Sequence, residues 1–117
     1  MRKIGIIILL AVLLSGCAKT AIEVSIINTS GETLNSVIVS TRSGRSLVEF
    51  TDLKDEESAT NKMHMYKELE ADGDYFVNVP QLELKSYAGY YTNGSPTEDK
   101  MMIVITPDSI KVNFSFE

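Results

Sequence analysis

The stretch IEVSIIN, residues 22–28, decides the fold of this chain. Its apolar residues Ile22, Val24 and Ile26 alternate with polar ones, so successive side chains point to opposite faces of an extended backbone. This period of two is typical of a strand with one buried face. Residues 29–31, TSG, then supply a turn. We therefore expect the folded part of the chain to begin with a β-strand over residues 22–28.

The same period recurs along the rest of the chain, and turn residues separate its segments. Residues 52–57 are acidic and predict a solvated connection, whereas Asp72-Gly73 predicts a hairpin turn. Residues 67–70 are the one place where a single helical turn is expected. The further predicted strands cover residues 34–41, 46–51, a segment with Met63 and Met65, 74–79, 82–91, 100–106 and 110–116.

Seven or eight short strands without a long amphipathic helix predict an all-β fold, a small antiparallel β-sandwich. A small barrel is the alternative closure. Val24, Val39 and Val77 lie on alternating apolar faces and are expected in the core. The pattern is similar in general appearance to small immunoglobulin-like domains of bacterial lipoproteins, although the chain lacks the Cys and Trp signature of true immunoglobulin domains.

The first seventeen residues predict an export signal. Arg2 and Lys3 precede an apolar run over residues 4–14, which spans roughly 16 Å as a helix, about half of a hydrocarbon core. The run is followed by Leu14-Ser15-Gly16-Cys17, which resembles the lipobox of bacterial lipoproteins. That resemblance implies cleavage after residue 16 and lipidation of the Cys17 sulfur. We expect a signal peptide over residues 1–16, a lipidated tether over 17–20 and a β-sandwich domain over 21–117.

Lipidation at Cys17 predicts a protein that is held on a membrane without spanning it, because two or more acyl chains anchor stably. The tether of four residues reaches at most about 14 Å, so the domain is expected close to the lipid surface. Ala18 follows the cysteine in place of the Asp that tends to retain lipoproteins at the inner membrane. The resemblance therefore implies a bacterial envelope protein on the outer membrane, facing the periplasm, if the source has two membranes.

The charge of the chain argues against nucleic acid as a partner. Eleven basic and 16 acidic residues give −5, and loss of Arg2 and Lys3 with the signal peptide gives 9 − 16 = −7. Cys17 is the only cysteine, so its lipidation leaves no thiol for a disulfide. The mature domain is expected to fold on its hydrophobic core alone.

The candidate catalytic and metal-binding residues of the sequence do not form a pattern typical of an enzyme or of a cofactor site. His64 is the only histidine, and strand alternation sends it to the face opposite Met63 and Met65, which predicts core methionines beside a surface histidine instead of a copper site. Glu70, Asp72 and Asp74 lack the spacing of a calcium loop. No metal site is expected.

Three tyrosines, Tyr87, Tyr90 and Tyr91, lie near Gly89 and the Asn93-Gly94 turn. Simple alternation places Tyr87 and Tyr91 together with Tyr90 opposite, so they form either part of the core or an exposed edge for an envelope protein or a glycan. We interpret the chain as a non-catalytic binding or assembly module. The alternative is a small inhibitor or accessory subunit of an envelope enzyme.

Overall fold

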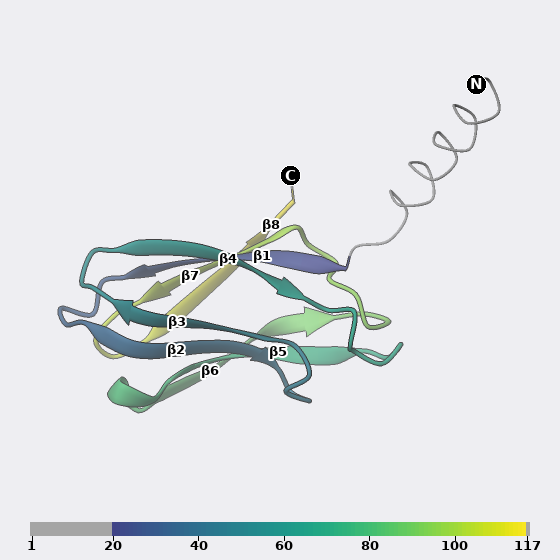
Figure 1. Ribbon diagram of the computed structural model, residues 1–117, viewed down its shortest axis with the longest axis horizontal. Helices are drawn as coiled ribbons and strands as arrows, with labels where there is room; N and C mark the ends of the chain where they lie inside the picture. Colours follow the sequence, from purple (N-terminus) through teal and green to yellow (C-terminus); the bar gives the residue numbers. More distant parts are fainter. Residues whose placement is uncertain (1–19, 117) are drawn as a thin grey trace, which may run out of the picture.

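The computed structural model describes residues 20–116, and these fold as a β-sandwich of eight strands, which confirms the predicted fold class (Figure 1). The predicted signal peptide and residues 17–19 lie outside the described residues. The strands are β1 (Ala21–Asn28), β2 (Leu34–Thr41), β3 (Leu47–Leu53), β4 (Ser58–His64), β5 (Gly73–Val79), β6 (Leu84–Tyr91), β7 (Lys100–Ile105) and β8 (Ile110–Ser115), with a short 3-10 helix, η1 (Pro80–Leu82), before β6.

The strands form two four-stranded sheets that lie face to face (Figure 1). Sheet I has the order β4-β1-β7-β8, and sheet II has the order β3-β2-β5-β6. All neighbours are antiparallel except β1 and β7, which run parallel with Glu23 opposite Lys100. The prediction of an antiparallel sandwich therefore holds apart from this pair. Side-chain period fixes which face of a strand is buried but carries no information about the direction of its partner.

The connection between β4 and β5, residues 65–72, differs from the sequence prediction. Asp72-Gly73 does not close a hairpin, because β4 belongs to sheet I whereas β5 pairs with β2 and β6 in sheet II. The connection crosses from one sheet to the other, and residues 67–70 form turns and bends in place of a helical turn. Sequence-local turn preference does not distinguish a hairpin from a crossing between layers.

The core lies between the sheets and is built from the inward faces of both. Val24, Val39 and Val77 are fully buried, as the alternation predicts. Met63 and Met65 are also buried beside an exposed His64, which confirms the prediction of core methionines next to a surface histidine. The alternation along each strand thus leaves one outward face per sheet for contact with solvent or a partner.

Candidate functional site

A β-bulge in β6 decides where its tyrosines point. In the pairing of β5 with β6, Phe76 lies opposite Tyr87 and Tyr75 lies opposite Gly89, so Ala88 is the extra residue. A bulge places two residues of one strand against one of its partner and thereby reverses the alternation beyond it. Side chains after Ala88 therefore point to the faces opposite to those that an uninterrupted strand would give them.

Tyr87 and Tyr90 share the outer face of sheet II, and Tyr91 lies in the core. The exposed fraction is 56% for Tyr87 and 62% for Tyr90, against 5% for Tyr91. The prediction that Tyr87 and Tyr91 lie together opposite Tyr90 is therefore wrong, because it assumed an uninterrupted alternation. The exposed pair is formed by residues three positions apart.

Phe76 is the centre of this outer face. Its ring meets that of Tyr87 edge-on, with 6.1 Å between centroids and an interplanar angle of 78°. The guanidinium carbon of Arg42 lies 4.9 Å from the Phe76 centroid, and the ammonium of Lys85 lies 5.6 Å from it. We call Arg42, Phe76, Lys85, Tyr87 and Tyr90 the aromatic face. Three rings and one cation thus lie on β5 and β6, and the second cation, Arg42, directly follows β2.

Asp74 fixes the position of Arg42 on the aromatic face. Its Oδ2 accepts hydrogen bonds from Nη2 of Arg42 at 2.6 Å and from Nε at 3.1 Å. Asp74 also lies opposite Tyr90 in the register of β5 and β6. Because the pair is partly exposed, it contributes little to the folding stability of the domain. Its main effect is to hold the guanidinium against the Phe76 ring.

A hollow of about 220 Å³ adjoins the aromatic face. Ile38, Ser40, Thr41 and Asn78 line it together with Arg42, Phe76 and Lys85. Such a surface offers aromatic rings for stacking and a few amide, hydroxyl and cationic groups for orientation, which is the composition typical of a recognition site.

The predicted lipidation site, Cys17, lies outside the described residues. The first described residue, Thr20, lies against the end of β4, where its carbonyl oxygen accepts a hydrogen bond of 2.6 Å from the backbone N–H of Met65. In residues 20–116, no helix has the length and apolar character needed to cross a membrane.

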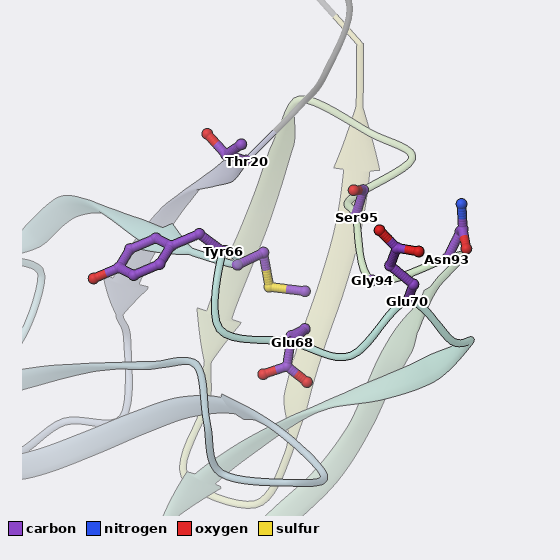
Figure 2. A pocket seen from close by; sticks show the side chains of 8 residues that line it. Thr20, Tyr66, Glu68, Glu70, Asn93, Gly94 and Ser95 are labelled. Carbon is purple, nitrogen blue, oxygen red and sulfur yellow. The ribbon is translucent and has the colours of Figure 1, made fainter.

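A polar pocket of about 240 Å³ lies beside Thr20, between the start of β1, the β4–β5 connection and the loop after β6 (Figure 2). Figure 2 shows Glu70, Asn93 and Ser95 around it and the ring of Tyr66 directed away from it. Among the described residues, no group of three or more His, Cys, Asp or Glu side chains is placed to hold a metal ion.

Glu68 forms the most connected polar cluster of the domain, and the sequence reasoning did not find it. Its carboxylate accepts hydrogen bonds from Ser46 Oγ at 2.7 Å, Ser43 Oγ and Tyr91 Oη at 2.9 Å, and Thr41 Oγ1 at 3.0 Å. The cluster joins the β4–β5 connection to the β2–β3 hairpin. The one sequence signal is the concentration of three hydroxyl residues in that hairpin.

The cluster shifts two pKa values in opposite directions. Burial raises the pKa of Glu68, but the hydroxyl donors, led by Ser46 and Tyr91, outweigh burial and lower it below 4.5. Burial, together with the hydrogen bond to Glu68, raises the pKa of Tyr91 to about 12. Glu68 is thus an anionic acceptor and Tyr91 a neutral donor. Their hydrogen bonds hold the β4–β5 connection against the β2–β3 hairpin and β6.

Tyr75 carries a buried hydroxyl without a hydrogen-bond partner among the described residues. Its ring is fully buried between the rings of Tyr91 and Phe114. The ring centroids lie 5.3 Å apart for Tyr75 and Tyr91 and 6.0 Å apart for Tyr75 and Phe114. Burial strongly raises the pKa of this phenol. Tyr75 lines none of the five pockets described for residues 20–116. We therefore interpret its buried hydroxyl as a loss of folding stability and not as part of a binding site.

Comparisons of the chain with models of known protein families, with curated proteins and with solved structures give no match. A functional proposal therefore rests on the residues themselves and on the geometry of the aromatic face.

Proposed function

We propose that this chain is a lipid-anchored protein of the bacterial envelope, attached through Cys17, and that it acts as a non-catalytic binding module. Its recognition surface is the aromatic face of sheet II. In a cell with two membranes it is held on the outer membrane and faces the periplasm. The partner is a protein or glycan of the envelope.

The observation that carries this proposal is the exposure of Tyr87 and Tyr90 on the same outer face of sheet II, one before the bulge at Ala88 and one after it. Tyr91 is buried in the core, whereas Tyr87 and Tyr90 keep more than half of their surface in solvent. Tyrosine gives a large contact area for little loss of side-chain entropy, which favours it in binding surfaces.

The rest of the face supports the same function. Asp74 holds Arg42 over Phe76 before any partner arrives, so less ordering accompanies binding. Both cations lie within a chain of net charge −5, and they offer donors to carbonyl, hydroxyl or carboxylate oxygens of a partner. The three rings and Lys85 lie on strands of the sheet, and Asp74 of β5 holds Arg42, which favours precise recognition.

The test is recovery of partners after mild crosslinking of intact cells. The double variant Tyr87→Ser and Tyr90→Ser is expected to lose the recovered partner while it keeps a melting temperature close to that of the unmodified protein. The matched control is Met102→Ser, which removes a side chain that is 51% exposed on the other sheet. That control is expected to keep the partner.

Two results would contradict the proposal. If the double variant recovers the same partners as the unmodified protein, the aromatic face is not the recognition surface. If intact mass shows an unmodified Cys17 on exported protein, the chain is not a lipoprotein, and the envelope anchor is wrong regardless of what the face binds.

A further inference from the structure

The two ends of the sandwich expose different kinds of side chains. Four loops form the end that lies far from Thr20: residues 29–33, 54–57, 80–83 and 106–109 (Figure 1). Those loops hold six acidic residues and a single basic one, and none of the large exposed apolar side chains of the described chain lies in them. We call this the distal end.

The opposite end, which we call the tether end, exposes large apolar side chains. Tyr66 is 70% exposed and Leu69 is 66% exposed, and both lie in the β4–β5 connection. Phe116, which is 69% exposed, follows the last residue of β8 at the same end. Isolated exposed apolar residues are ordinary, but their concentration at one end of a sandwich marks a contact surface.

Thr20 places this surface beside the predicted lipid. The Thr20 carbonyl binds the backbone of Met65, the residue next to Tyr66, and Thr20 and Tyr66 line the same pocket (Figure 2). Residues 17–20 reach at most about 14 Å. A lipid on Cys17 therefore keeps the membrane within reach of the β4–β5 connection, whereas the distal end lies a strand length further away.

We propose that Tyr66 and Leu69 enter the headgroup region of the membrane, so that the tether end is an interfacial contact and the sandwich stands with its strands pointing away from the lipid surface. The inference rests on the proposed lipid anchor at Cys17. Tyrosine suits this place because its ring is apolar and its hydroxyl stays hydrated at headgroup depth. Lys67, whose ammonium lies 5.9 Å from the Tyr66 ring, is placed to meet lipid phosphate.

The charges at this end indicate which lipid is contacted. Glu70 and Asp72 lie on the same connection and offset Lys67, so attraction to an anionic surface does not drive the contact. Burial of apolar surface drives it, and zwitterionic lipid is sufficient. In this orientation the aromatic face stands at the side of the molecule, open to a partner in the compartment.

The chain contains no tryptophan, so a single introduced indole reports on its own position. The protein is expressed from its full sequence, signal peptide included, as Tyr66→Trp, as Leu69→Trp and, as a control at the distal end, as Lys54→Trp. Each is reconstituted into phosphatidylcholine vesicles with and without brominated acyl chains, and flotation with the vesicles is measured alongside emission. We expect a blue-shifted emission and about a twofold loss of intensity in brominated lipid for the first two variants, and neither for Lys54→Trp.

The outcomes separate the two proposals. Co-flotation with quenching at positions 66 and 69 but not at 54 supports the interfacial contact. Co-flotation in which all three variants emit alike overturns the contact and leaves the lipid anchor intact. Failure of the full-length protein to float overturns the anchor, and the interfacial contact falls with it.

Discussion

Replacing Glu68 by alanine is predicted to destabilise the domain more than any other single change of an incompletely buried residue. The carboxylate is the common acceptor for four hydroxyls, three from the β2–β3 hairpin and one from β6. Its removal leaves Ser46 and Thr41, each 2% exposed, without their charged partner. The β4–β5 connection then loses its attachment to the β2–β3 hairpin.

The magnitude follows from the buried donors. A hydrogen bond to a charged group contributes about 1.5 to 3 kcal/mol, and an unsatisfied buried donor costs about 1 to 3 kcal/mol. Ser43 regains water as a partner, and Thr41 keeps Ser43 Oγ and the Ser46 carbonyl oxygen, so the cost falls mainly on Ser46 and in part on Tyr91. We therefore expect Glu68→Ala to lower the free energy of unfolding by about 2 to 4 kcal/mol, which for a domain of this size is a fall of roughly 10 to 20 °C in melting temperature.

The assay is thermal and urea unfolding followed by circular dichroism. The matched control is Glu70→Ala, which removes an exposed carboxylate from the same connection and is expected to change stability by less than about 0.5 kcal/mol. A Glu68→Ala variant as stable as Glu70→Ala would refute the reasoning, because the cluster would then contribute nothing to the fold.

The same cluster predicts a pH dependence. The pKa of folded Glu68 lies below its ordinary value of 4.5, so its contribution is complete above pH 4.5 and is lost as the pH falls through the lower, folded pKa. The stability difference between the unmodified protein and Glu68→Gln is therefore expected to shrink below pH 4.5. A difference that stays constant from pH 7 to strongly acidic pH would contradict a lowered pKa.

Four further predictions follow from single residues. Cys17→Ser is expected to leave the precursor uncleaved or mislocalised, and intact mass of the unmodified membrane-extracted protein should begin at Cys17 and carry acyl mass. Tyr75→Phe is expected to be neutral or to stabilise by up to about 1 kcal/mol in urea unfolding, because it removes a buried hydroxyl that has no partner among the described residues, and a loss above that size would disprove this view. Gly89→Ala is expected to lower the free energy of unfolding by about 1 to 3 kcal/mol, because the φ of Gly89 is 153° and the new Cβ would lie 2.6 Å from the Phe114 ring. An unchanged melting temperature would contradict this close approach of Gly89 to Phe114. As the pH rises from 10 to about 12 the folded protein is expected to lose stability, because Tyr91 ionises at a lower pH when unfolded, and Tyr91→Phe should remove part of that loss.

The strands and their buried faces are the part of this fold that the sequence encodes locally. The predicted strand over residues 34–41 coincides with β2, and the period of two places Val37 and Val39 in the core while Ile38 lies on the other face. β3 runs two residues further than expected, because Leu53 continues the buried pattern beyond the acidic residue Asp52. Such features depend only on neighbours in the chain, so a single sequence contains them.

Pairing and loop chemistry depend on residues that are far apart in the chain, and these were missed. The parallel contact of β1 with β7 joins Glu23 to Lys100, and the Glu68 cluster joins the β4–β5 connection to Thr41, Ser43 and Ser46. Neither has a signature at fixed spacing. Asp72-Gly73 shows the same limit, since a dipeptide typical of hairpins here precedes a strand in the other sheet.

The bulge at Ala88 is the one long-range feature for which the sequence contains a local signal, namely Gly89 inside the predicted strand over residues 82–91. Glycine inside a strand often marks a bulge or a close approach of another element, and here Gly89 marks both, since it adjoins the extra residue and leaves room for the Phe114 ring of sheet I. A shift of one residue exchanges the faces of every side chain beyond it. The same glycine that lets the two sheets pack together therefore also decides that Tyr90, and not Tyr91, is displayed beside Tyr87, so packing of the core and composition of the proposed recognition surface are set at a single position.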